Sequence, residues 1–230
     1  MILGLLVGGV LAGKSLIRAA GLQSVVKEYD HYRTSALTFK TKYLALPGDM
    51  PNATQFWGQA AASGITCFMF SSTDKKTCDG NGDGLIYPFV TGTAGSAEPA
   101  RALQHMANAD IIPGKYDGAN DYGVGKIGRW VYGYTGSVSG SSYRFNGEYG
   151  HSLTFTGKTA SNSYILTPIE GWSIDNKIDD GKPATGKVAH TSPVVTLDQC
   201  TDTASNTNLS ANYLLDGSST RCSLIFRNQF

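Results

Sequence analysis

A short acidic loop carries the clearest chemical signal in this sequence. In DGNGDG, residues 79–84, oxygen-bearing side chains recur at alternate positions and a glycine follows each of them. This spacing matches the first half of a calcium loop of the EF-hand type, and Ca²⁺ takes about six to eight oxygen ligands. Val90 stands where that pattern needs a bidentate acid, so Glu98 or Asp74 would have to complete the site. The candidate calcium ligands are therefore Asp79, Asn81 and Asp83, and the alternative is a glycine-rich turn whose Asp and Asn side chains cap their own backbone.

The four cysteines suggest disulfides rather than a metal site. No C-x-x-C pair occurs, which excludes the usual zinc-ligand spacing. An even number of cysteines in two local pairs favours two disulfides in an oxidising compartment, and each would stabilise the fold by roughly 3 kcal/mol. The alternative is four buried thiols in a reducing compartment. The expected pairs are Cys67–Cys78 and Cys200–Cys222.

Other motifs that suggest catalysis lack the context they need. Residues 123–128 fit G-x-G-x-x-G, but a strand-like segment follows where a nucleotide site needs a helix. Residues 181–187 resemble a P-loop, yet Val188 replaces the hydroxyl that binds Mg²⁺. The histidines are scattered, with no H-E-x-x-H, and no G-x-S-x-G occurs. We expect no enzyme, since nothing selects a pair for glycoside hydrolysis among the acids Glu148, Glu170, Asp175, Asp179 and Asp180.

The composition narrows the class of protein. The chain has 230 residues, a net charge of +1 and 16% charged residues, which argues against a nucleic-acid binder with a basic surface. Glycine is frequent, at 28 residues, and charged residues fall below the usual quarter. This profile is typical of an extracytoplasmic, loop-rich β protein.

The first 43 residues predict one long helix. Residues 2–13 carry no charge, but 13 residues of helix rise only about 20 Å, too little to cross a hydrocarbon core of about 30 Å. No basic segment precedes them, as a secretory signal would require. The helix should stop before Leu46-Pro47, because proline disfavours helix in the residue before it. Its apolar face continues through Leu16, Ile17, Ala20, Leu22, Val25, Val26, Tyr29, Tyr32, Ala36, Phe39 and Tyr43.

The remaining sequence predicts a mixed head. Short helices are expected over 97–109 and 167–179, and strands over 129–134, 163–168, 193–197 and 222–227, with a hairpin at Asn146-Gly147. The aromatic row Trp130, Tyr132 and Tyr134 either packs on the long helix or offers a sugar-binding platform. We predict an α+β fold in which the long helix packs on an antiparallel sheet. The expected parts are a helix at 1–44 and a globular head at 45–230.

The N-terminal region resembles a known family. ILGLLVGGVLAGKSLIRAA, Tyr32-Arg33 and KYLALPGDMPNATQFWG are similar to the beginning of type IV pilin-like proteins and pseudopilins of Gram-negative bacteria, over residues 2–58. The family also has a short basic leader that ends in glycine, followed by a stretch with an early glutamate, and none of these is present here. We therefore expect the sequence to begin inside the hydrophobic segment of such a protein.

This resemblance implies a structural subunit of a type IV pilus-like or type II secretion pseudopilus filament. Such a subunit is anchored in the inner membrane with a periplasmic head, then assembles with sibling subunits after contact with a prepilin peptidase and an assembly platform. The charged residues Lys14, Arg18, Lys27 and Glu28 are expected to be solvated or to contact other subunits. The alternative is a secreted or anchored carbohydrate-binding module. The expected assembly surface comprises Leu5, Leu6, Val7, Val10, Leu11, Leu16 and Ile17.

Overall fold

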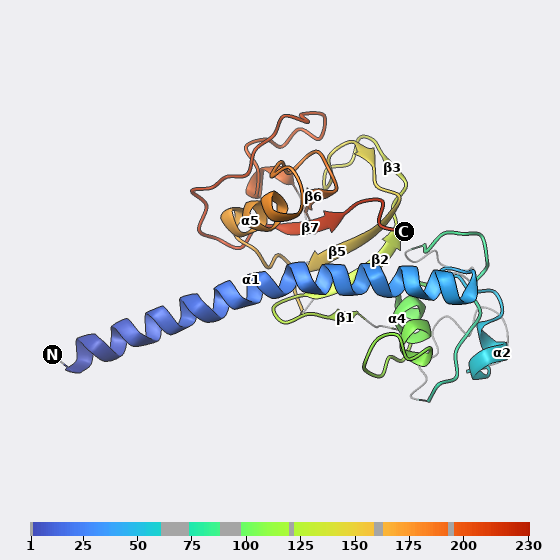
Figure 1. Ribbon diagram of the computed structural model, residues 1–230. Helices are drawn as coiled ribbons and strands as arrows, with labels where there is room; N and C mark the ends of the chain where they lie inside the picture. Colours follow the sequence, from blue (N-terminus) through green and yellow to red (C-terminus); the bar gives the residue numbers. More distant parts are fainter. Residues whose placement is uncertain (1, 61–73, 88–97, 120–121, 159–162, 193–195) are drawn as a thin grey trace.

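One helix of 42 residues, α1 (Ile2–Tyr43), runs along the whole molecule and packs its second half on an antiparallel sheet (Figure 1). The computed structural model describes residues 2–60, 74–87, 98–119, 122–158, 163–192 and 196–230, with the backbone alone for residues 2–9, 11 and 12. The expected α+β class is confirmed. The further helices are α2 (Ala53–Trp57), α4 (Glu98–Asn108), α5 (Pro168–Ile178) and the 3₁₀ turn Leu197–Gln199.

The main sheet has five strands in the order β1-β2-β5-β7-β6. Every neighbouring pair in it is antiparallel. A separate ribbon, β3-β4, pairs Ser137–Val138 with Gly147–Glu148. The strands of the sheet are β1 (Gly123–Val124), β2 (Arg129–Tyr134), β5 (His151–Thr156), β6 (Val188–Thr191) and β7 (Ser223–Phe226).

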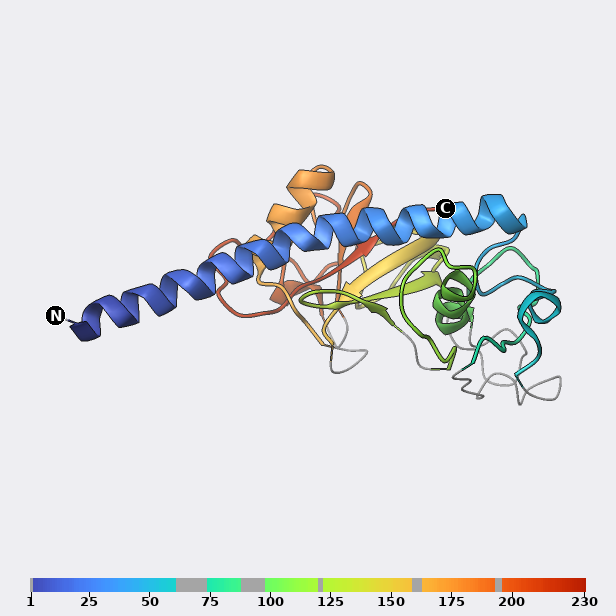
Figure 2. The same cartoon turned by 60° about the horizontal axis from the view of Figure 1, so that its bottom comes forward.

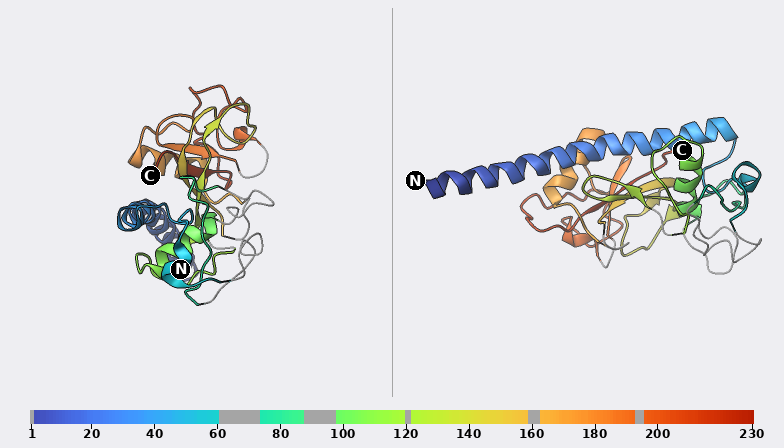
Figure 3. Two further views of the ribbon diagram at one scale, coloured as in Figure 1. Left: turned by 90° about the vertical axis from the view of Figure 1, so that its right-hand side faces the viewer. Right: turned by 90° about the horizontal axis from the view of Figure 1, so that it is seen from below.

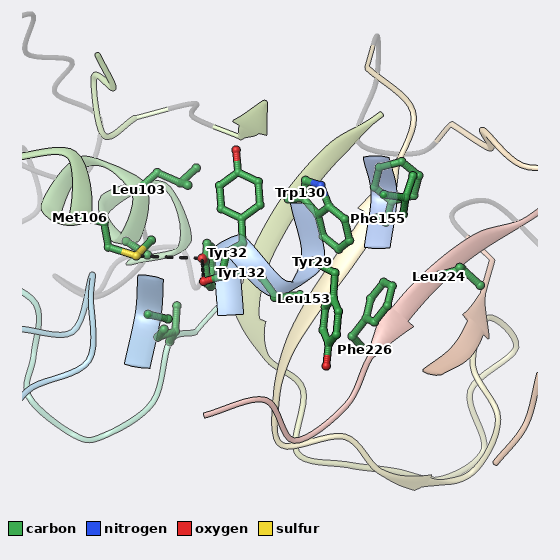
Figure 4. Packing of buried hydrophobic residues seen from close by; sticks show 14 of the residues in the cluster. Tyr29, Tyr32, Leu103, Met106, Trp130, Tyr132, Leu153, Phe155, Leu224 and Phe226 are labelled. Atoms are coloured by element: carbon green, nitrogen blue, oxygen red, sulfur yellow. Dashed lines mark hydrogen bonds between the residues drawn. The ribbon is translucent and has the colours of Figure 1, made fainter. Parts of the chain in front are cut away.

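The second half of α1 buries one stripe against the sheet. Val25, Tyr29, Tyr32, Ala36 and Phe39 are buried, and their spacing of three or four residues places them on one helix face. The Tyr29 ring stacks on that of Phe226, with 4.5 Å between centroids (Figure 4). The apolar periodicity of the sequence therefore identified the docking face of this half of the helix correctly.

Two of the three aromatic residues in the row of β2 belong to the core. Trp130 and Tyr132 are 0% and 1% exposed and lie on the sheet face that meets α1 (Figure 4). Their cross-strand partners are Phe155 and Leu153 of β5. Trp130 and Phe155 have ring centroids 4.8 Å apart. This packing confirms the core interpretation for Trp130 and Tyr132 and leaves these two side chains no surface for a sugar, whereas Tyr134 is only half-buried.

Polar contacts fix the register of α1 on the sheet. Glu28 accepts hydrogen bonds from the Lys126 backbone N–H at 2.8 Å and from Trp130 Nε1 at 3.0 Å. The hydroxyl of Tyr132 donates to the backbone oxygen of Tyr32 at 2.6 Å. Glu28 therefore binds its own head instead of being solvated.

The end of α1 leads into a tightly held turn. The helix stops at Tyr43, before Leu46-Pro47 as expected. Gly48 has φ +88°, and a Cβ at this position would lie 2.2 Å from the Glu98 carbonyl oxygen, so only glycine fits. Its N–H donates to Nδ1 of His105 at 3.0 Å, which ties the turn to α4.

Three strand predictions need correction. Asn146-Gly147 is not a hairpin turn, because Gly147 already belongs to β4 and pairs back to Val138. Within 163–168, only Leu166 makes a β-bridge, to Cys222. Residues 193–195 lie outside the described residues, and Leu197 begins a 3₁₀ turn. The strand Val188–Thr191 had not been expected; it is the edge partner of β7.

The Cys200–Cys222 disulfide is present, with Cα atoms 5.3 Å apart. Cys67 lies outside the described residues, so the Cys67–Cys78 pair stays a prediction. Both Cys200 and Cys222 are fully buried in the main core, where the bond joins the 3₁₀ turn to the start of β7.

Replacing Cys200 and Cys222 together by alanine should lower the free energy of unfolding by about 3 kcal/mol, because the unfolded chain loses its cross-link. Urea unfolding of the double variant and of the oxidised wild type measures this difference. Peptide mapping without reductant serves as the control and should recover the linked pair. A wild type with both thiols free would contradict the prediction.

Candidate functional site

The head holds α1 most firmly at Arg18. Its Nε and Nη2 atoms donate to the two carboxylate oxygens of Glu170, each at 2.6 Å, and Nη2 also donates to the Ile165 carbonyl oxygen at 2.7 Å. Burial raises the pKa of Glu170, but the bonds from Arg18 and Thr167 outweigh it and leave the pKa lowered. Glu170 also closes the capping box with Thr167 at the start of α5. One carboxylate thus caps α5 and ties it to α1.

The exposed apolar segment of α1, formed by Val10, Leu16 and Ile17, lies N-terminal to the Arg18–Glu170 ion pair. These side chains are 57%, 72% and 70% exposed. The ribbon continues here well beyond the head (Figures 1 and 2). Val10 and Ile17 are seven residues apart and share one helix face. The side chains of Leu5, Leu6, Val7 and Leu11, the other expected assembly residues, lie outside the described residues.

The two halves of α1 thus have opposite environments. The C-terminal half lies along one side of the head (Figure 3), and its buried stripe is covered by the sheet and by α4. The N-terminal half carries large apolar side chains in solvent, and their burial would be favourable by about 25 cal/mol per Å². An exposed apolar surface of this kind is suited to binding another protein rather than to catalysis. Within the described residues, none of the helices is both long and apolar enough to cross a membrane.

The acidic loop has hydrogen bonds of the kind expected for a glycine-rich turn, because the side chains of Asn81 and Asp83 accept the backbone N–H groups of Asp83 and Leu85, at 3.0 and 2.9 Å. Asp79 accepts hydrogen bonds from the backbone N–H and hydroxyl of Thr54, at 2.7 and 3.0 Å. Asn81 and Asp83 lie together, with Asn81 Nδ2 donating to Asp83 at 2.9 Å. Asp74 binds the backbone of Lys76, outside this group. Protein donors therefore occupy several of the expected oxygens, and calcium binding stays a prediction.

Two buried carboxylates hold this loop from inside. Asp49 accepts the backbone N–H groups of Gly82, Asp83 and Gly84 at 2.7–3.1 Å. Glu98 accepts those of Asn81 and Tyr87 at 3.4 and 3.0 Å. Burial is the main cause that raises the pKa of both acids, that of Glu98 to about 7. The sequence pattern alone had not indicated Asp49, because it lies 30 residues before the loop that it supports.

An acidic cluster at the end of α5 brings three of the expected acids together. Ligand oxygens of Asp175, Asp179 and Asp180 lie within 4.8 Å of one another. Each carboxylate already accepts protein donors: Asp175 from Tyr213 and Gly181, Asp179 from Lys187 and Val188, Asp180 from Lys182 and Thr185. The cluster therefore organises the turn between α5 and β6.

Asp175→Asn should remove part of the pH dependence of stability. Burial, then the charges of Asp180 and Asp179, raise the pKa of Asp175 to about 8. Because its folded pKa exceeds the unfolded value, Asp175 stabilises the fold fully below about pH 4. That contribution falls as pH rises toward 8, by up to about 1.4 kcal/mol per pH unit. The asparagine variant should therefore match the wild type below about pH 4 and become the more stable protein above it, by an advantage that grows until about pH 8.

Urea unfolding from about pH 3.5 to 9 measures this difference. Exposed Asp216→Asn provides the control and should follow the wild-type curve throughout. A constant difference between Asp175→Asn and the wild type at every pH would contradict a carboxyl that is protonated in the fold.

Comparison with known proteins identifies no related protein. The chain matches no protein-family model, no curated protein and no solved structure.

Proposed function

We propose that the chain is a pilin-like structural subunit, which assembles into a filament of the type IV pilus or type II secretion pseudopilus kind through α1. The observation that carries this proposal is the exposed apolar segment Val10, Leu16 and Ile17 on a helix that is held to an α+β head from Arg18 onward. The N-terminal resemblance to pilin-like proteins supports it. So does the pilin-like shape, a long N-terminal helix followed by an antiparallel sheet.

The proposed mechanism is physical rather than catalytic. The apolar face of α1 leaves solvent when it packs against the helices of neighbouring subunits, and its burial drives assembly. Such head-to-tail contacts do not close on themselves, so they grow a fibre. The head then faces outward. In this proposal the subunit is anchored in the inner membrane before assembly, with its head in the periplasm. Its partners are sibling subunits, a prepilin peptidase and an assembly platform.

The carbohydrate-binding alternative receives less support from the site. It needed exposed aromatics, but Trp130 and Tyr132 are buried in the core. Tyr143 is 49% exposed, but it does not belong to β2, the strand that carries that row. We therefore do not put this function forward.

Electron microscopy of material sheared from the producing cells tests the proposal. An antibody against the head should decorate filaments along their length. Recovery of the protein as a monomer alone, in cells whose sibling subunits do form filaments, would reject it.

A further inference from the structure

A polar cavity of about 580 Å³ lies beside the docked half of α1. Four segments line it: α1, the end of α5, the turn before β6 and the chain after β7. Each of the first three contributes one exposed cation, namely Arg33, Lys177 and Lys187. Elements far apart in the sequence thus bring positive charge to one cavity.

These three cations have no carboxylate partner in the described part of the chain. The ion pairs formed there join Arg18, Lys75 and Lys76 to other acids. One acid, Asp30, lines the cavity. The nearby carboxylate of Asp179 accepts the backbone N–H groups of Lys187 and Val188. Positive charge therefore exceeds negative charge in the lining.

A fourth cation at the cavity, Arg227, is 7% exposed. Its guanidinium lies 4.2 Å from the centre of the Tyr149 ring, and Nη2 donates to the Tyr149 hydroxyl and to the Ala184 carbonyl oxygen, both at 3.0 Å. These acceptors are neutral, and the described residues offer Nε of Arg227 no hydrogen-bond partner. Burying a cation without a neighbouring anion costs free energy. Because its charge is not neutralised, Arg227 adds a positive electrostatic field beside the three exposed side chains.

We propose that this cavity binds an oxyanion, the carboxylate or phosphate group of a small solute. Flexible Lys and Arg side chains can close on such a group with charge-assisted hydrogen bonds. The exposed cations contact the anion directly, and Arg227 stabilises it through its field. The inference is independent of filament assembly, because all four cations belong to the one chain.

Titration of the purified chain with pyrophosphate at low salt, followed by calorimetry, tests the proposal. Saturable binding of one pyrophosphate per chain is expected. The double variant Lys177→Gln/Lys187→Gln should bind at least about tenfold more weakly, because each charge-assisted bond contributes a factor of about ten or more. Arg33→Gln should also weaken binding.

The matched control is Lys14→Gln/Lys126→Gln, which removes the same charge from exposed positions outside the cavity. It should keep the wild-type affinity. An equal loss in both double variants would overturn the proposal, since it would show attraction to net charge alone. Absence of saturable binding by the folded wild type would overturn it as well.

Discussion

Replacing Leu16 and Ile17 together by serine should abolish filament assembly and leave the head folded. Both side chains are more than two-thirds exposed in the isolated chain, at 72% and 70%, so the free energy of unfolding should change by no more than about 0.5 kcal/mol. In a filament each would be buried, and each loss would cost about 2 kcal/mol per subunit. Because every subunit in the filament loses this burial free energy, the filament should not form stably. Electron microscopy and sedimentation measure assembly.

The head offers a matched control for this variant. Leu209 and Leu215 are also exposed, at 46% and 49%, but they lie near the C-terminus of the chain, in the head. Their replacement by serine should leave assembly intact. Normal filaments from the Leu16→Ser/Ile17→Ser variant would contradict the assignment of this segment as the interface.

Trp130→Ala should destabilise the head by about 3–5 kcal/mol, the usual cost of a large cavity. The side chain is fully buried between α1 and the sheet, and its ring contacts those of Phe155 and Phe226. The change also removes the donor at 3.0 Å from Glu28, which then keeps the Lys126 backbone N–H. Urea unfolding monitored by circular dichroism measures the loss.

Trp172→Ala is the control, because this side chain lies at the surface of α5 and is 36% exposed. Its loss should cost about 1 kcal/mol or less. Trp130→Phe keeps most of the side-chain volume, so this variant should fold. Its loss of unfolding free energy should lie between those of Trp130→Ala and Trp172→Ala. If Trp130→Ala cost no more than Trp172→Ala, the docking of α1 on β2 would be wrong.

The sequence predicted the fold where a periodic pattern and a local signal agreed. The stripe from Val25 to Phe39 and the proline after Leu46 together specified α1 and its end. The helix expected over 167–179 corresponds to α5, and the structure adds a capping box between Thr167 and Glu170 that had not been predicted. The strand 188–191 was missed because an edge strand of four residues is specified by its partner β7 rather than by its own pattern.

The candidate site was less predictable because its key contacts join residues far apart in the sequence. Arg18 and Glu170 form an ion pair although 152 residues separate them, and the sequence around either residue does not indicate its partner. The same holds for Glu28 with Trp130, which changes a supposedly solvated acid into a structural one. The acidic loop shows the converse. Its local spacing suggested a cation, while Asp49 and Thr54, outside the motif, satisfy much of its hydrogen bonding.

The most direct measurement is thiol labelling of Ile17→Cys in the free subunit and in the filament fraction. A cysteine on the exposed head residue Ser173 serves as the reference, and the wild type gives the background. We expect rapid labelling of both cysteines in the free subunit, and protection of position 17 alone in filaments. Equal labelling of position 17 in the two states would contradict burial of this segment in the assembly.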